Sequence, residues 1–132
     1  MPPPSDPEPI HILLVEDTET DVLIIRRTLN RGALDYRLTV VRQAEEALDL
    51  LADEAQSYDV LVTDHRLPGM HGLELCREVL ERRYSVAMVM LTGAGSEDLA
   101  VQALKAGVDE YLIKDTRGGY LALFSTVIEE VV

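Results

Sequence analysis

The sequence has little cysteine, little lysine and no long apolar run, and each shortage excludes a class of protein. Its single cysteine, Cys76, has no partner for an internal disulfide, which fits a reducing compartment. No apolar segment approaches the roughly 18–20 residues of a membrane span, and no signal-peptide pattern opens the chain. We therefore expect a cytoplasmic protein that does not enter a membrane.

Positive charge is also scarce. The 132 residues hold 24 acidic and 12 basic side chains other than histidine, for a formal net charge of -12. A domain this acidic repels a phosphate backbone, so we expect no nucleic-acid binding by it. Only two lysines are present, Lys105 and Lys114, and any role that requires an ammonium group therefore has two candidates.

Proline is almost confined to the start of the chain. Five of the six prolines lie in the first nine residues, and the sixth is Pro68. Proline-rich segments without periodicity remain extended or disordered. The sequence therefore predicts a disordered leader over residues 1–9 and one folded domain over residues 10–132, a length typical of single domains.

Short apolar runs alternate with helical patterns along that domain. The runs cover Ile10–Val15, Tyr36–Val41, Asp59–Thr63, Val86–Leu91 and Asp109–Ile113. Apolar residues in the gaps recur with the 3.6-residue period of helices, with Gly32 and Gly107 as expected helix ends and Ser96 as an expected N-cap. Runs such as VAMVML are apolar on both faces, as buried parallel strands are. The pattern predicts a three-layer, doubly wound α/β domain of five βα units.

Such sheets bind ligands at the carboxyl ends of their strands, and four predicted strands end in reactive side chains. Glu16 and Asp17 follow the first strand, Asp64 the third, Thr92 the fourth and Lys114 the fifth. Carboxylates about 5 Å apart repel by about 3 kcal/mol per pair at an effective dielectric near 20, so either one of them is protonated or a cation lies among them. An all-oxygen site suits Mg²⁺, with Mn²⁺ as the alternative, and Mg²⁺ commonly works with phosphate. These residues predict Mg²⁺-dependent phosphoryl chemistry.

Other phosphate sites fit the sequence less well. The P-loop pattern GxxxxGK[ST] is absent, and the turn after the first strand, Glu16 to Glu19, lacks the glycines of a dinucleotide-binding loop. Each polar residue taken alone would be an ordinary strand-to-loop residue. The combination at four strand ends is what favours a binding site.

The motifs as a set resemble the receiver domain of bacterial two-component response regulators. They are LLVED at the first strand, VTDHRLPGMHGLEL around the third, MLTG at the fourth and AGVDEYLIKD at the fifth. The resemblance extends from about Ile10 to Val132. It implies a flavodoxin-like fold with a parallel sheet of strand order 2-1-3-4-5.

The resemblance also implies a metal site around a phosphoacceptor. Asp64 is the expected phosphoacceptor, attacking a phosphohistidine to form an aspartyl phosphate. Asp17 is the expected direct ligand of Mg²⁺, and Glu16 supports the ion, commonly through water. Asp64 and the backbone carbonyl of Arg66 complete the expected ligand set.

Three further residues are expected to respond to the phosphoryl group. The resemblance implies that Thr92 bonds a phosphoryl oxygen and that Lys114 pairs with the group. Tyr111, three residues before Lys114, matches an aromatic switch whose rotation follows Thr92. Together they imply a two-state electrostatic switch with a packing readout.

The sequence departs from the family pattern at several positions. Glu16 replaces the commoner aspartate, and His71 stands where an aspartate is usual. We expect His71 to lie in a turn or at a helix start rather than to bind metal. His65 is expected to be a loop residue beside Asp64. Asp115 replaces a common proline, which leaves the geometry of the Lys114–Asp115 bond open. Arg66 and Ala94 lie where receivers tune hydrolysis of the acyl phosphate.

Three hypotheses follow for function. The first is a phosphorylatable receiver that takes its phosphoryl group from a histidine kinase or a histidine phosphotransfer protein and switches an interaction surface. The alternative is a receiver-like interaction module that works without phosphate. The third, a Mg²⁺-dependent small-molecule phosphatase, requires a larger pocket than short loops provide. A phosphorylation-dependent dimer is a further expectation, with the output on another chain or in a part of the protein beyond residue 132.

Overall fold

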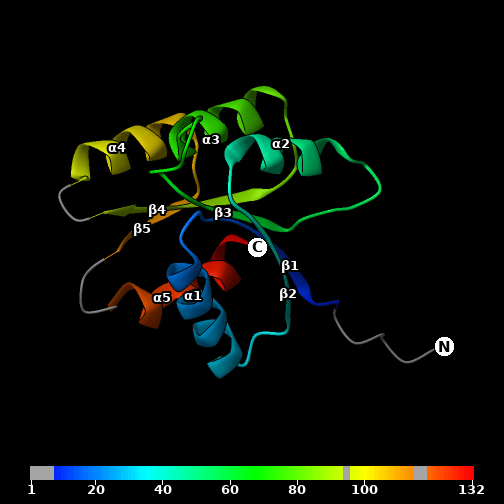
Figure 1. The fold of residues 1–132 in the computed structure, drawn as a ribbon, viewed down its shortest axis with the longest axis vertical. Helices are drawn as coiled ribbons and strands as arrows, with labels where there is room; N and C mark the ends of the chain where they lie inside the picture. The colour runs from blue at the N-terminus through cyan, green and yellow to red at the C-terminus, as the bar shows by residue number, and fades with distance from the viewer. Residues whose placement is uncertain (1–7, 94–95, 115–118) are drawn as a thin grey trace.

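The computed structural model describes residues 8–93, 96–114 and 119–132 and contains five strands and five helices in strict alternation (Figure 1). The strands are β1 (Ile10–Val15), β2 (Tyr36–Val41), β3 (Val60–Asp64), β4 (Ala87–Gly93) and β5 (Glu110–Lys114). The helices are α1 (Glu19–Arg31), α2 (Ala44–Ala52), α3 (Gly72–Glu81), α4 (Glu97–Ala106) and α5 (Gly119–Val131). Most of the expected leader and the Lys114–Asp115 bond lie outside the described residues.

The five strands form one parallel sheet in the order β2-β1-β3-β4-β5, which confirms the predicted fold. Helices α2, α3 and α4 cover one face of the sheet, and α1 and α5 cover the other (Figure 1). Alternate residues of β1 point to opposite faces of the sheet. Leu13 packs towards α2 and α3, while Ile12 and Leu14 pack towards α1 and α5. Burial on both sides explains why the central strands are continuously apolar.

Three strands begin one residue later than the sequence predicts. Asp59 and Asp109 precede β3 and β5 because their carboxylates accept backbone N–H groups from neighbouring segments. Asp59 Oδ2 lies 2.8 Å from the nitrogen of His11, and Asp109 Oδ2 lies 2.8 Å from the nitrogen of Met88. The same three strands also extend further at their carboxyl ends, so that Asp64 and Lys114 are the last residues of their strands.

The helix ends follow the predicted signals. Gly32 lies directly after α1, and Gly107 ends α4 with a φ of +118°, a conformation that suits glycine. Ser96 occupies the N-cap position of α4, although its side chain makes no capping hydrogen bond there. Among the helices of the described ranges, none combines the length and apolar character needed to span a bilayer.

Gly72 begins α3 directly against the end of β3. A Cβ atom at this position would lie 2.3 Å from the carbonyl oxygen of Asp64 and 2.9 Å from the Cα atom of His65. The N–H of Gly72 donates to the carbonyl oxygen of His65 at 2.9 Å. Because both clashing atoms belong to the backbone, no rotamer change relieves them. The absence of a side chain at Gly72 thus fixes how closely α3 approaches Asp64.

We expect Gly72→Ala to lower the free energy of unfolding by about 2 kcal/mol or more, since the helix or the end of β3 must move. Gly93→Ala is the matched control, because among the described residues no atom comes within 4 Å of a Cβ built there. Its expected effect is below about 0.5 kcal/mol. Urea denaturation measures both, and equal midpoints for the two variants would contradict the close approach of α3.

Cys76 lies on the buried face of α3 and is completely inaccessible to solvent. Burial raises the pKa of its thiol from 9.0 to about 12. Between these values the folded protein keeps a proton that the unfolded chain loses. Stability therefore falls as the pH rises through this window.

We expect the wild-type protein to lose more stability than Cys76→Ala between about pH 9 and pH 11, because only the wild type carries this thiol. Urea midpoints at each pH measure the loss. Equal losses in the two proteins would contradict a buried, protonated thiol.

Candidate phosphoryl and metal site

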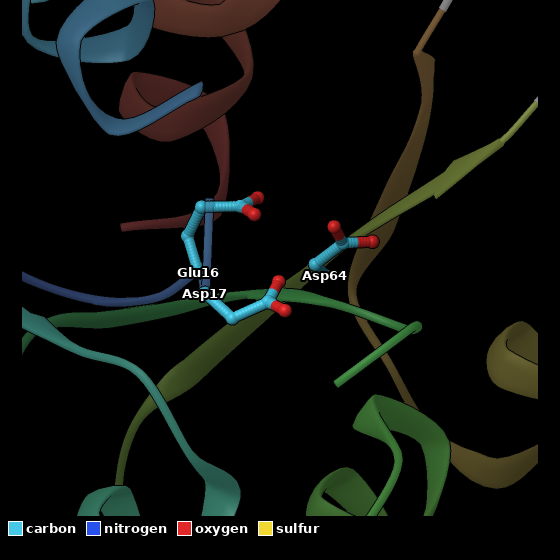
Figure 2. Close-up of side chains that lie close together, drawn as sticks. All are labelled: Glu16, Asp17 and Asp64. Atoms are coloured by element: carbon cyan, nitrogen blue, oxygen red, sulfur yellow. The ribbon is translucent and has the colours of Figure 1, made fainter. Parts of the chain in front are cut away.

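Three carboxylates meet at the carboxyl edge of the sheet (Figure 2). Glu16 and Asp17 directly follow β1, and Asp64 ends β3, the neighbour of β1 in the sheet. One oxygen from each of the three side chains lies within 4.8 Å of the others. Glu16 is buried, Asp64 is half-buried and Asp17 is exposed, so the cluster opens to solvent on one side. The structure thus brings together the three acidic residues that the sequence predicted.

Lys114 reaches the same cluster from the end of β5. Its Nζ atom lies 2.8 Å from Glu16 Oε2 and 2.9 Å from Asp64 Oδ2. Burial alone would lower the pKa of Lys114, but hydrogen bonds to Glu16, Asp64 and Asp21 outweigh it and hold the pKa above the ordinary value. The ammonium therefore stays charged through the whole physiological range.

Both oxygens of the Glu16 carboxylate have partners. Oε2 accepts from Lys114, and Oε1 accepts the backbone N–H of Thr18 at 3.1 Å. Burial raises the pKa of Glu16, and the hydrogen bond from Lys114 partly offsets that effect. Since β5 is separated from β1 by two strands, the long side chains of glutamate and lysine span a gap between distant strand ends.

Thr92 lies one residue before the end of β4 and is completely buried. Its Oγ1 atom has no hydrogen-bond partner among the residues that the structure describes. A buried hydroxyl without a partner in the described part of a structure is uncommon and marks Thr92 as a candidate site residue. Beside it, residues that include Asp64, Arg66, Gly93 and Lys114 line a hollow of about 250 Å³.

The remaining predicted site residues lie around this centre. The exposed side chain of Arg66 lines the hollow next to Asp64. Tyr111 is half-buried on β5 and lines a different groove, between β5 and α5, together with Leu123. In the β4–β5 pairing, Thr92 is opposite Ile113, two residues beyond Tyr111. Ala94 lies outside the described residues.

The two histidines near Asp64 form a stacked pair, with ring centroids 5.1 Å apart. His65 Nδ1 accepts the backbone N–H of Leu73 at 3.3 Å, which connects the loop after β3 to the first turn of α3. Burial and the neighbouring His71 lower the pKa of His65. His71 occupies the N-cap position of α3, which confirms its expected place at a helix start.

Asp21 is a site residue that the sequence reasoning missed. It lies in the first turn of α1, and its Oδ2 atom is 2.9 Å from Lys114 Nζ. The available signal was weak: Asp21 is an acidic residue in the first turn of the helix that directly follows Glu16 and Asp17. The sequence alone did not show which way the helix faces.

Comparisons with known proteins agree with this geometry. Residues 12–122 match the model of the response regulator receiver domain family. The chain is 39% identical over 109 residues to the response regulator protein PilR of Pseudomonas aeruginosa, covering 82% of this chain and 24% of PilR. It is 38% identical over 105 residues to a chemotaxis protein CheY homolog of Campylobacter jejuni, covering 78% of this chain and 79% of that protein.

A solved receiver domain from Clostridium thermocellum has a similar fold. Its TM-score is 0.79 at 27% identity, and the match covers 92% of this chain and 93% of that one. The lengths of the relatives differ, since the chain spans only 24% of PilR and 44% of the response regulator RppA of Synechocystis.

The matched family consists of phosphoacceptor signalling domains of two-component systems rather than enzymes. Its model covers most of this chain, and the relatives agree with it in sequence and in fold. The chain therefore belongs to the response regulator receiver domain family.

Proposed function

We propose that Asp64 accepts a phosphoryl group from the phosphohistidine of a histidine kinase or a histidine phosphotransfer protein. The main support for the proposal is that Asp64 lies beside the carboxylates of Glu16 and Asp17 and 2.9 Å from the ammonium of Lys114. A carboxylate oxygen of Asp64 attacks phosphorus, the P–N bond breaks, and its electron pair remains on the imidazole nitrogen. The product is an aspartyl phosphate at the half-buried end of β3.

The acidic cluster suits a divalent cation. Glu16, Asp17 and Asp64 supply oxygen ligands within 4.8 Å of one another, and the backbone carbonyl of Arg66 is the proposed fourth protein ligand. Mg²⁺ or Mn²⁺ fits such a donor set. When bound, the cation neutralises the charge that develops on the transferred phosphoryl oxygens.

The groups around Asp64 have complementary roles in this proposal. The hydroxyl of Thr92, buried and without a described partner, donates to a phosphoryl oxygen. Lys114 donates to the same group with an ammonium that remains protonated. Tyr111 rotates in response to Thr92 and alters the groove between β5 and α5, where Leu123 is exposed. That surface is also the proposed site of a phosphorylation-dependent dimer.

Phosphorylation by a small-molecule donor tests the proposal directly. Incubation with acetyl phosphate and Mg²⁺ should raise the intact mass by about 80 Da, the mass of one phosphoryl group, in an adduct that base removes. Asp64→Asn should abolish the adduct, and EDTA should abolish it in the wild-type protein. Asp49→Asn, which removes an exposed carboxylate from α2, is the matched control and should be modified normally.

The other outcomes identify the competing functions. An unmodified protein that still binds a partner would indicate an interaction module that works without phosphate. Release of phosphate from many small substrates, with no stable adduct, would indicate a phosphatase. Modification that survives in Asp64→Asn would show that the phosphoacceptor is another residue.

We expect Thr92→Val to separate stability from phosphoryl binding. Valine has the shape of threonine without the unpaired hydroxyl, so the free energy of unfolding should stay unchanged or rise by up to about 1 kcal/mol. Binding of beryllofluoride, a phosphoryl mimic, should weaken by about tenfold or more, because a charge-assisted hydrogen bond is lost. Calorimetry with Mg²⁺ measures the second effect, and unchanged affinity would contradict the role of Thr92.

A further inference from the structure

Among the described residues that bond to Lys114, Asp21 is the one that the proposed phosphotransfer does not use. It comes from helix α1, whereas Glu16 and Asp64 come from the ends of strands. Its Oδ2 atom lies 2.9 Å from Lys114 Nζ, as close as Asp64 Oδ2. The exposed fractions are 31% for the Asp21 side chain and 17% for that of Lys114, so the pair is only partly open to solvent.

The ammonium group of Lys114 has no donor to spare. A lysine ammonium carries three N–H groups and no acceptor. The three are directed to three different carboxylates, those of Glu16, Asp64 and Asp21, at 2.8, 2.9 and 2.9 Å. A phosphoryl oxygen that binds Lys114 must therefore displace one of these bonds or share a donor with it.

The three bonds respond differently to phosphorylation. Glu16 and Asp64 belong to the cluster of carboxylates that could hold a cation, and in the proposed function Asp64 itself becomes an acyl phosphate, a mixed anhydride. Asp21 lies outside that cluster, and the proposed phosphotransfer does not modify its carboxylate. Its bond to Lys114 is therefore available in both states, and a carboxylate so close to Lys114 opposes the approach of an anion.

We propose that Asp21 is a positioning residue that holds Lys114 towards α1 and competes with the phosphoryl group for its ammonium. The inference rests on the proposed phosphorylation of Asp64. Asp21 therefore favours the resting state. Its bond to Lys114 weakens the interaction that the ammonium can make with the phosphoryl group. Asp21 acts through Lys114 and does not touch the transferred group.

The first test is the affinity for beryllofluoride at saturating Mg²⁺. Asp21→Asn should bind the mimic about threefold to fivefold more tightly than the wild type, the range expected for one partly exposed charge pair. Glu19→Gln is the matched control, because Glu19 is an exposed carboxylate in the same turn of α1 and makes no bond to Lys114. An unchanged or weaker affinity in Asp21→Asn, or an equal gain in Glu19→Gln, would overturn the proposal.

The second test measures stability without metal and without phosphate. In EDTA, Asp21→Asn should lower the melting temperature by about 2–5 °C, since it breaks an ion pair between α1 and β5. In the Lys114→Met background, the same substitution should leave the melting temperature unchanged or raise it, because only repulsion between carboxylates is then removed. Equal effects in the two backgrounds would show that Asp21 does not act through Lys114.

The two tests also distinguish this inference from the function on which it rests. If no variant binds beryllofluoride and acetyl phosphate leaves the wild type unmodified, the proposed phosphorylation fails, and competition by Asp21 fails with it. The stability measurements would still decide whether Asp21 positions Lys114. Normal phosphorylation of the wild type, with no effect of Asp21→Asn in either test, would overturn the inference alone.

Discussion

The sharing of one ammonium among three carboxylates is the interaction on which the geometry of the site depends. Lys114 contacts Glu16, Asp21 and Asp64, which lie just after β1, in α1 and at the end of β3. Two carboxylates about 5 Å apart repel by about 3 kcal/mol at an effective dielectric near 20, so the three could not stay together without a cation among them. Asp17 remains outside this ion-pair network and exposed, which leaves the cluster negative on its solvent side. The network therefore holds the site together and leaves a group of carboxylates that could bind a divalent cation.

The parallel sheet is what makes this meeting of side chains feasible. Because all five strands run in the same direction, their carboxyl ends share one edge, and residues distant in sequence become neighbours there. Lys114 and Glu16 are 98 positions apart in the chain. The first residue of α3, Gly72, allows the helix to contact the backbone of Asp64 itself, so the position of the carboxylate depends on backbone packing as well as on the sheet.

The sequence predicted most of the fold and the centre of the site, for physical reasons that also explain its errors. Apolar runs identified the central strands β1, β3 and β4 because these are buried on both faces. The edge strands β2 and β5 are mostly half-buried, and β2 carries Arg37 and Thr39 between its apolar residues. Two of the three errors at strand starts came from Asp59 and Asp109, whose carboxylates accept hydrogen bonds from neighbouring backbone N–H groups. Asp21 and Gly72 were not predicted, because one depends on the rotation of α1 and the other on how closely two backbones approach. Neither leaves a periodic signal in the chain.

Thr92 and Lys114 differ in their hydrogen bonding in the resting state. The hydroxyl of Thr92 is buried without a partner in the described structure, whereas the ammonium of Lys114 has used all three donors. A buried hydroxyl without a partner costs about 1–3 kcal/mol, and the fold tolerates this at the edge where a phosphoryl group is proposed to bind. A phosphoryl oxygen would satisfy Thr92 but would take a donor from a carboxylate around Lys114. In the proposed function, the ease of switching therefore depends on the balance between the hydrogen bond gained by Thr92 and the hydrogen bond that Lys114 gives up with a carboxylate.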